Sequence, residues 1–410
     1  MTARPAVCIT GMGVVSALGR DMAAFDSALF EGRSAVLGEA LNLPGTTPTR
    51  VPLARCSFDA TAVRAPSRLP LDRGSAMALA AAEAAADAAQ WQLGSGDPER
   101  LGVFWGSGMG GAASFEAACA AVYADHKRIR PTSVVTSMPN APLAELALRF
   151  GTRGAALAYA CACALASVAI GEALRALRDG RLDVALVGGS EALLAPAVIG
   201  AWQAMRVLAP ATGEARDACR PFSADRAGFA LGEGAAALWL ETEAHARARG
   251  VRWRSTLSGY ANNCDAQHMT QPHPDGQVRV VHAALRDAGL VPADIGHVNA
   301  HGTATTAGDA AEAESLKRVF GATPPAVTAS KAIMGHLLGA GGALELVATL
   351  CALERGAAPP TAHVEKVDEA FDIDLVRGQP RALPGLRHAI SNSFAFGGTN
   401  AVLVVSKVDA

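Results

Sequence analysis

The chain places a thiol between a predicted strand and a predicted helix in the stretch Ala158-Tyr159-Ala160-Cys161-Ala162-Cys163-Ala164-Leu165-Ala166. A cysteine in the first turn of a helix faces unpaired backbone N–H groups and the positive end of the helix dipole, and both favour the thiolate. Cys163 is therefore a candidate nucleophile. The alternative is that Cys161 and Cys163 are small buried hydrophobic residues, and the rest of the chain has to decide between the two.

Strands and helices alternate on both sides of this stretch. The strands that we expect comprise residues 6–10, 101–105, 155–163, 184–189, 229–240, 295–300, 326–329, 389–394 and 399–406. The helices that we expect comprise residues 14–30, 73–91, 114–126, 163–178, 278–288, 309–320 and 341–355. Such alternation is typical of an α/β fold. Because the pattern restarts near Thr256, we predict two similar halves, residues 1–255 with Cys163 and residues 256–410. Residues 32–63, rich in Pro, Gly and Thr, are predicted to form a surface loop.

The composition limits the kinds of protein that the chain can be. Half of its 410 residues are hydrophobic and 18% are charged. Globular domains typically have roughly 25% charged residues, so we expect a large core and a buried subunit interface. A net charge of −2 gives no electrostatic reason to expect nucleic acid or a membrane surface as the main partner.

The cysteines and the N-terminal segment bear on the compartment. The eight cysteines are scattered, without a Cys-x-x-Cys pair, so neither a zinc site nor a disulfide framework is indicated. The apolar run at residues 6–10 is too short for a signal peptide or a membrane span. A reducing cytoplasm is therefore the compartment that we expect.

A glycine-rich run follows the predicted strand at residues 101–105. It reads Gly106-Ser107-Gly108-Met109-Gly110-Gly111 and matches Gly-x-Gly-x-x-Gly, a pattern that can hold a dinucleotide pyrophosphate at a helix N-terminus. However, the chain contains 42 glycines, and no clear ribose-binding acid closes a βαβ unit. A dinucleotide site is therefore the weaker interpretation of this run.

Polar groups follow predicted strands at three further places. These are residues 301–312, 330–336 and 392–400. Because ligands collect at the carboxyl ends of the strands of α/β sheets, the three loops could converge on Cys163. Their occurrence together, in this order, is what favours a functional site.

Each polar residue also has a simpler interpretation when taken singly. His301 and His336 could be core or surface histidines, and Lys331 could be a solvated cation. A zinc site formed by His301, His336 and Asp309 is conceivable, but the chain lacks the His-Glu-x-x-His or paired-cysteine spacing that would support it. We therefore expect no metal.

Taken together, these stretches resemble the condensing enzymes, specifically stand-alone β-ketoacyl-acyl carrier protein synthases of types I and II. The resemblance spans nearly the whole chain and rests on residues 9–13, 220–223, 228–234, 265–270, 301–305, 331–336 and 397–400. It implies the five-layered αβαβα thiolase fold made of two similar halves. This fold agrees with the restart of the pattern near Thr256.

The resemblance also implies roles for individual residues. The nucleophile corresponds to Cys163, because the Ile-Gly pair that follows it lies at residues 170–171. The catalytic histidines correspond to His301 in the His-Gly-Thr-x-Thr motif and His336 in the Lys-x-x-x-Gly-His motif. Lys331 is the motif lysine, and Glu312 is expected to be its partner.

Further expectations concern the substrate channel. Phe396 corresponds to a gating aromatic residue whose backbone N–H joins that of Cys163 in the oxyanion hole. Thr303 and Thr305 are expected to line the tunnel for phosphopantetheine. Met109 lies where relatives have an apolar residue beside the acyl pocket, so the run at residues 106–111 is better interpreted as pocket wall.

The implied reaction is the decarboxylative condensation of a malonyl thioester with an acyl group held on Cys163. It needs no cofactor, because phosphopantetheine on an acyl carrier protein brings the substrates. The expected partners are that carrier protein and a second subunit, in a homodimer or in a heterodimer with a chain-length-factor-like subunit. Four arginines could receive an acidic carrier protein, although a solvated surface explains them equally well: Arg64, Arg68, Arg73 and Arg206.

Several positions depart from the family pattern. Leu165 and Ala166 replace a small hydroxyl residue and a glycine, Ala395 replaces a glycine, Met334 replaces a common threonine, and Cys161 is an additional thiol. These changes favour a specialised ketosynthase, for instance one that elongates a polyene or another polyketide, as much as a fatty acid enzyme. The alternatives are a chain-length-factor-like subunit, which usually lacks the nucleophile, and a CoA-dependent thiolase, which lacks this pairing of motifs.

Overall fold

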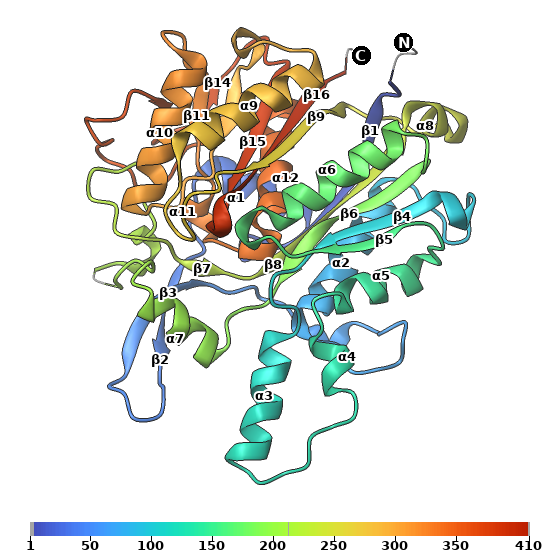
Figure 1. The fold of residues 1–410 in the computed structure, drawn as a ribbon, viewed down its shortest axis with the longest axis vertical. Coiled ribbons are helices and arrows are strands. Elements are labelled where there is room, and N and C mark those ends of the chain that lie inside the picture. Colours follow the sequence, from blue (N-terminus) through green and yellow to red (C-terminus); the bar gives the residue numbers. More distant parts are fainter. Residues whose placement is uncertain (1–3, 212, 409–410) are drawn as a thin grey trace.

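One sheet runs through both halves of the chain in the computed structural model, which describes residues 4–211 and 213–408. Its eleven strands have the order β13-β11-β10-β15-β16-β9-β1-β8-β6-β4-β5 (Figure 1). The strands are β1 (Val7–Val15), β4 (Leu101–Gly106), β5 (Ala156–Tyr159), β6 (Val184–Glu191), β8 (Gly234–Thr242), β9 (Ser255–Cys264), β10 (His297–Asn299), β11 (Ala326–Thr328), β13 (Asp374–Leu375), β15 (His388–Phe394) and β16 (Thr399–Lys407).

The sheet repeats one five-stranded pattern. The order β5-β4-β6-β8-β1 in the first half corresponds to β11-β10-β15-β16-β9 in the second, with the same parallel and antiparallel pairings. The two units join through only two residue pairs of β1 and β9, Cys8 with Thr256 and Ile9 with Ser255. β6 and β8 are buried along their whole length, as expected of strands covered by helices on both faces.

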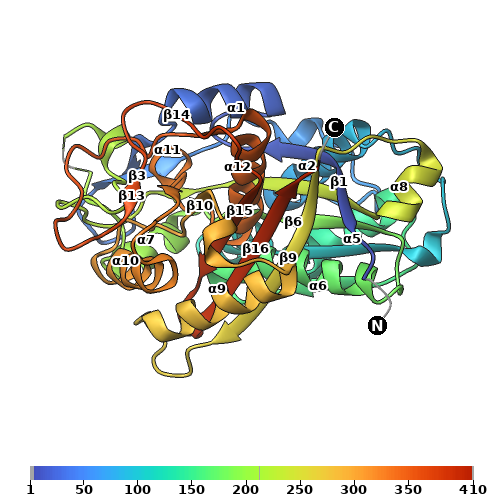
Figure 2. The ribbon, with the colours of Figure 1, turned by 90° about the horizontal axis from the view of Figure 1, so that it is seen from above.

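Helices form three layers around the two halves of the sheet. They are α1 (Met22–Glu31), α2 (Arg73–Ala88), α3 (Ala112–Tyr123), α4 (Ser133–Ser137), α5 (Ala141–Phe150), α6 (Leu165–Arg178), α7 (Pro196–Ala204), α8 (Glu243–Arg249), α9 (Pro274–Ala288), α10 (Thr306–Phe320), α11 (Lys331–Met334) and α12 (Gly341–Arg355). α6 and α12 pack against each other and against strands of both halves. Figure 2 shows α9 lying along β9 and β16. α2 and α5 cover the first half, while α9 and α10 cover the second. These layers confirm the predicted thiolase fold.

The close packing of α2 on the sheet explains two glycines near the N-terminus. A Cβ atom at Gly11 would lie 2.1 Å from the Ala85 carbonyl oxygen, and one at Gly13 would lie 2.1 Å from that of Ala81. Only glycine lets the backbone of β1 approach the Ala-rich helix so closely. Gly11 and Gly13 are therefore packing residues.

The structure corrects two sequence-based element predictions. Residues 32–63 are not all loop, because β2 (Leu37–Leu41) and β3 (Thr49–Ala54) pair with each other, and β3 also pairs with β7 (Leu231–Gly232). The remaining short strands are β12 (Ala357–Ala358) and β14 (Arg381–Ala382). The helix predicted at residues 14–30 begins only at Met22, because β1 continues to Val15 beside β8. The boundary at residues 255 and 256 stays a prediction.

Within residues 4–211 and 213–408, no helix combines the length and the apolar character that crossing a membrane would require.

Candidate active site

Cys163 lies in a tight turn at the start of α6. The turn is the 3-10 helix η3 (Ala162–Ala164), and Ala162 adopts a φ of 48° in it. Such a left-handed residue is strained and persists only where its surroundings hold it. Cys163 is 7% exposed, and the backbone N–H groups of Phe396 and of Cys163 itself lower the pKa of its thiol. The Cys163 sulfur therefore lies near two backbone donors.

The protonation of Cys163 differs from the expectation of a thiolate. Burial is the largest influence and raises the pKa of the Cys163 thiol to about 11, although Lys331 and the Phe396 N–H lower it. Lys331 and the backbone N–H groups therefore do not outweigh desolvation. At neutral pH the resting group is a neutral thiol.

His336 contacts Cys163 from the second half of the chain. Its Nε2 lies 3.1 Å from the Cys163 Sγ, and its ring packs edge-on against Phe229 with centroids 5.1 Å apart. The backbone N–H of Leu338 donates to His336 Nδ1 at 3.4 Å. Because Nδ1 accepts, the proton of the neutral ring is on Nε2 and points toward the sulfur.

His301 is held in the same tautomer by Lys331. The Lys331 ammonium donates to His301 Nδ1 at 3.3 Å, and an ammonium has no lone pair with which to accept. Burial is the main cause that lowers the pKa of both His301 and His336 well below the ordinary value. Both rings are therefore neutral at pH 7 and present an Nε2–H donor toward the nucleophile.

Lys331 pairs with Glu345, and the sequence-based expectation of Glu312 as its partner is wrong. The ammonium, 1% exposed, donates to Glu345 of α12 and to the His301 carbonyl oxygen at 2.5 Å. Glu312 instead accepts the backbone N–H groups of His301 and Gly302, each at 2.8 Å, and the Asn392 amide at 3.1 Å. Glu312 thus holds the backbone of the His301 loop.

The three catalytic candidates could be mistaken for a metal site. The ligand atoms of Cys163, His301 and His336 all lie within 4.8 Å of one another. However, Lys331 and the Leu338 N–H occupy Nδ1 of the two rings, so the Nε2 atoms carry protons instead of free lone pairs. Asp309, the third ligand considered from sequence, accepts the N–H groups of Phe222 and Ala304 instead. This donor set does not fit a metal ion.

A cavity of about 230 Å³ connects these residues to the surface. It is lined by Cys163, Trp202, Met205, Val207, Phe229, His268, Met269, Thr270, Gln271, Pro272, Gln277, His301, Thr303, Thr305, Ala307, Gly308, His336, Phe394, Ala395, Phe396 and Gly398. Its walls are polar at Thr303 and Thr305 and aromatic at Trp202, Phe229 and Phe396. The structure therefore brings the predicted tunnel and gate residues into one space with the nucleophile.

Comparison with known proteins now identifies the family. The family models described as β-ketoacyl synthase, N-terminal domain and C-terminal domain match residues 4–246 and 254–365. The chain is 38% identical to nodulation protein E of Rhizobium meliloti (strain 1021), covering 98% of this chain and 99% of that protein. It is 33% identical to 3-oxoacyl-[acyl-carrier-protein] synthase 2 of Staphylococcus aureus (strain COL), covering all of both.

The chain belongs to the β-ketoacyl synthase family.

Solved structures of the family share the fold. The structure titled "The ishigamide ketosynthase/chain length factor" matches with a TM-score of 0.89 and 30% identity, covering 99% of this chain and 100% of that chain. A type II polyketide synthase acyl-carrier protein in complex with its ketosynthase matches with a TM-score of 0.90 and 27% identity, covering 99% and 100%. As a β-ketoacyl synthase, the chain is an acyltransferase of the condensing type.

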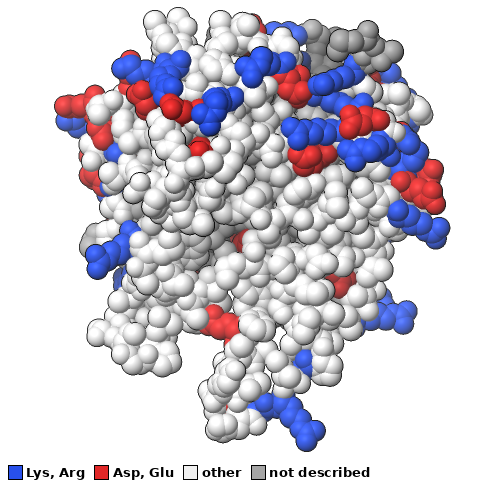
Figure 3. Space-filling model, viewed as in Figure 1, with Lys and Arg blue, Asp and Glu red and all other residues white. Residues whose placement is uncertain are grey.

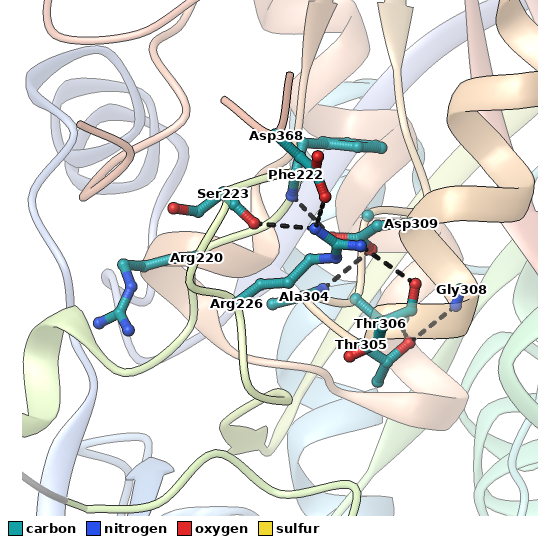
Figure 4. A network of polar contacts seen from close by, with 12 residues as sticks. Arg220, Phe222, Ser223, Arg226, Ala304, Thr305, Thr306, Gly308, Asp309 and Asp368 are labelled. Carbon is teal, nitrogen blue, oxygen red and sulfur yellow. Dashed lines mark hydrogen bonds and ion pairs between the residues drawn. The ribbon is translucent and has the colours of Figure 1, made fainter. Parts of the chain in front are cut away.

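An ionic network, which the sequence motifs do not indicate, holds the tunnel wall of this β-ketoacyl synthase (Figure 4). Arg226 donates to Asp368 at 2.7 Å and to the Thr306 carbonyl oxygen at 3.2 Å. Asp309 accepts the Ala304 N–H at 3.0 Å, and burial raises its pKa to about 7. The loop that carries Thr303 and Thr305 is therefore fixed from two sides.

Trp202 of α7 is a second residue that sequence reasoning missed. Its ring stacks on Phe396 with centroids 6.2 Å apart and meets Phe229 edge-on at 5.8 Å. The loop after Phe396 is held from the other side, since the Gly397 N–H donates to the Met269 carbonyl oxygen at 2.7 Å. The predicted gating residue of this β-ketoacyl synthase is thus held between Trp202 and the Met269 loop.

Met109 does not line this cavity in the described residues, and its side chain is 48% exposed. Its role beside an acyl pocket stays a prediction. The glycine-rich run around it is not arranged to bind phosphate, because the N–H groups of Gly108 and Met109 both donate to the buried carboxylate of Glu191.

Proposed function

We propose that the chain condenses an acyl group held on Cys163 with a malonyl group presented by an acyl carrier protein, with loss of CO₂. The observation that carries this proposal is the arrangement at the base of the cavity. There the Cys163 sulfur lies 3.1 Å from His336 Nε2 and within 4.8 Å of the ligating nitrogen of His301. A thiol flanked by two neutral N–H donors suits thioester chemistry followed by enolate stabilisation.

The first step moves the acyl group to the enzyme. The Cys163 sulfur attacks the thioester carbonyl, a new C–S bond forms, and the bond to the phosphopantetheine sulfur breaks. Because a thiol enters and a thiol leaves, the Cys163 proton ends on the departing phosphopantetheine sulfur. The backbone N–H groups of Cys163 and Phe396, which lie near the sulfur, stabilise the tetrahedral oxyanion.

The second step produces the carbon nucleophile. Malonyl thioester loses CO₂, and the electron pair of the broken C–C bond becomes an enolate whose oxygen receives hydrogen bonds from His301 and His336. Lys331 holds the His301 ring and pairs with Glu345. Neutral histidines suit this role, because donors that keep their protons stabilise the enolate without quenching it.

The third step joins the two groups. The enolate carbon attacks the acyl carbonyl on Cys163, the two backbone donors again hold the oxyanion, and the Cys163 thiolate leaves and takes up a proton from solvent. Nothing in the three steps requires a metal or a cofactor held by this chain. Phosphopantetheine on the carrier proteins supplies both thioesters, with Thr303 and Thr305 along its path.

We assign the enzyme to specialised, polyketide-type elongation. Leu165 is fully buried, and its Cδ1 lies 2.4 Å from where a Gly106 Cβ would be. Leu165 therefore fills the space that a small residue would leave beside the nucleophile. Identity to nodulation protein E, at 38%, exceeds that to 3-oxoacyl-[acyl-carrier-protein] synthase 2, at 33%. The departures of Leu165 and Ala166 from the family pattern are what supports this assignment.

An acyl carrier protein is the partner proposed at the cavity mouth. Arg206 is exposed between Met205 and Val207, which both line the cavity, and Arg64 and Arg68 are also exposed. A complex of a related ketosynthase with its carrier protein is known. Arg73 does not belong to this surface, because its guanidinium pairs with the buried Glu233 at 2.7 Å.

A second subunit is proposed along the edge strand β5. The Leu157 side chain on this strand is 45% exposed, and Phe115 and Tyr123 of α3 are 54% and 80% exposed. In Figure 3, charged side chains gather over the upper part of this face, while the part over β5, α3 and α4 is largely uncharged. An apolar edge strand favours pairing with another chain, either a second copy or a chain-length-factor-like subunit. Native mass spectrometry of the chain expressed alone distinguishes the two.

All eight cysteines are free thiols, which supports a reducing compartment such as the cytoplasm.

Two other functions are less well supported. A chain-length-factor-like subunit would not need a thiol aligned with two histidines and two backbone donors. A CoA-dependent thiolase would not need the His301 and His336 donors together with Lys331.

Intact-mass analysis after incubation with acyl-carrier proteins tests the proposal. We expect an acyl adduct on the wild type and on Cys161→Ala, and none on Cys163→Ala. A panel of saturated, conjugated and β-keto acyl groups would identify the preferred class. Normal condensation by Cys163→Ala would overturn the mechanism, and a marked preference for saturated chains would overturn the assignment to polyketide-type elongation.

A further inference from the structure

Glu191 is a buried carboxylate that the proposed mechanism does not use. It ends β6, is 1% exposed, and accepts the backbone N–H of Gly108 at 2.7 Å and that of Met109 at 3.2 Å. The backbone of Gly339 also lies against it, because a Cβ atom there would lie 2.0 Å from a carboxylate oxygen, and the Gly339 N–H lowers the pKa of Glu191. One side chain of the first half therefore joins the glycine-rich loop after β4 to a turn in the second half.

The turn that Glu191 contacts is the one that follows His336. It contains the 3-10 helix η6 (Leu338–Ala340), in which Leu338 has a φ of 43°. A non-glycine residue in the left-handed region is strained and persists only where neighbouring contacts hold it. Leu338 is also the residue whose N–H donates to His336 Nδ1.

The backbone on both sides of Glu191 packs closely against its carboxylate. A Cβ atom at Gly339 would lie 2.0 Å from a Glu191 carboxylate oxygen, and one at Gly108 would lie 2.9 Å from the same oxygen. Glycine at both positions thus lets the backbone close on the carboxylate, which the backbone N–H groups stabilise in part, since burial still raises the pKa of Glu191 to about 7.

We propose that Glu191 is a positioning residue that fixes the tautomer and direction of His336 through the Leu338–Gly339 turn. The inference rests on the proposed function, in which His336 must present an Nε2–H to the enolate oxygen. By holding Gly339, Glu191 keeps the strained Leu338 N–H against His336 Nδ1. Without that contact, Nδ1 can carry the proton and Nε2 becomes an acceptor, which cannot stabilise an enolate.

Glu191→Gln is the most direct test, because the amide keeps the shape and replaces one acceptor oxygen by an NH₂ group facing backbone donors. We expect malonyl-carrier protein decarboxylation to fall about tenfold, less than the roughly 10²-fold expected for losing a donor outright. Acyl adduct formation on Cys163 should fall less than decarboxylation, because in the proposed first step backbone N–H groups, and not His336, stabilise the oxyanion. In ¹⁵N-histidine-labelled protein, the ring-nitrogen shifts of His336, assigned with His336→Ala, should move toward the Nδ1–H tautomer.

Gly339→Ala provides a second perturbation that keeps the carboxylate, since its Cβ would push Glu191 and the turn apart. It should give the same spectroscopic change. Glu145→Gln is the matched control, because Glu145 is another buried carboxylate that accepts a backbone N–H, that of Ser67, on α5. It should leave both the decarboxylation rate and the His336 shifts unchanged.

The outcomes separate the two proposals. Decarboxylation that is unchanged in His336→Ala would overturn the proposed donor role itself. If His336→Ala fails to decarboxylate while Glu191→Gln and Gly339→Ala keep wild-type His336 shifts, the positioning role of Glu191 is wrong and the donor role stands. Equal losses of decarboxylation and acylation with unchanged shifts would show that Glu191 only supports the glycine-rich loop.

Discussion

The connection from β5 to α6 and the connection from β11 to α12 occupy equivalent places in the two halves, yet they carry opposite kinds of side chain. The first is made of small apolar residues around Cys163. The second contains Lys331 and His336, both buried. Because the two helices pack against each other, the two connections meet, and the thiol of one half receives its polar neighbours from the other.

The difference lies in what each half must do to bury its functional group. A neutral thiol can be buried at little cost, and burial keeps the Cys163 pKa high at about 11. A buried ammonium needs a partner, so the second half supplies Glu345 on α12 for Lys331. The duplicated fold therefore has two equivalent connections. Only the second carries buried charged side chains, because α12 supplies the partner that offsets the cost of burying the Lys331 charge.

The largest expected effect comes from breaking the ion pair between Lys331 and Glu345. Lys331→Met should lower the free energy of unfolding by about 3–5 kcal/mol, because it leaves Glu345 buried without a cation. Cys163→Ala should change it by only about 1 kcal/mol. Burial already raises the pKa of Glu345 to about 7, so the loss in Lys331→Met should be greater at pH 8 than at pH 6. Urea denaturation of both variants measures the contrast.

A double variant sharpens the same comparison. Lys331→Met/Glu345→Leu should regain most of the stability, since an apolar pair can replace a buried ion pair. It should not regain decarboxylation, because His301 loses the donor to Nδ1. Equal urea midpoints for Lys331→Met and Cys163→Ala would contradict the contrast between the two connections.

The next largest effect distinguishes the roles of His301 and His336. His301→Ala should lower malonyl decarboxylation by about 10²–10³-fold, the usual cost of one donor to an oxyanion. Acylation of Cys163 should change by only a few fold, because His336 is the ring in contact with the sulfur. His297→Gln is the control, since that buried histidine of β10 contacts Thr328 instead of the site. Equal losses in both reactions would refute the division of labour.

The pH dependence of Cys163 alkylation tests the first half by itself. With a pKa of about 11, the thiolate fraction rises with pH throughout the neutral range. The rate of iodoacetamide labelling at Cys163, with Cys163→Ala as background, should therefore rise about tenfold per pH unit between about pH 6 and 9. A plateau near pH 7 would mean that the helix N-terminus outweighs burial.

Sequence patterns predicted the parts of the site that follow strands directly. Cys163, His301, Lys331, His336 and Phe396 each lie in a short motif after a predicted strand, and the carboxyl ends of those strands meet in the fold. The α/β alternation and the restart near Thr256 likewise follow from local periodicity. The motifs therefore predicted both the architecture and the set of residues around the nucleophile.

The site residues that the sequence did not predict lie outside any recognisable sequence motif. Glu345 lies between Leu344 and Leu346 in the apolar part of α12, Trp202 lies on a short helix, and Arg226 and Glu191 lie beside glycine-rich segments. Each acquires its role from a contact with a strand, helix or loop that is distant in the sequence. The choice of Glu312 as the partner of Lys331 failed for the same reason, because side-chain pairing depends on how α12 lies against β10 and β15.

The smallest expected effect concerns the loop after β10, the counterpart of the glycine-rich loop after β4. Thr303 and Thr305 join their hydroxyl groups at 2.9 Å, and Thr305 also caps α10 by accepting the Gly308 N–H at 3.2 Å. Thr303→Val should raise the KM for the carrier-protein substrate several fold with little change in stability. Thr305→Val should raise KM similarly and also cost about 1 kcal/mol, the usual value of an N-cap. Steady-state kinetics and thermal unfolding of the two variants measure both effects. A changed kcat with unchanged KM would show that the two hydroxyl groups act on the chemistry instead of lining the path of the substrate.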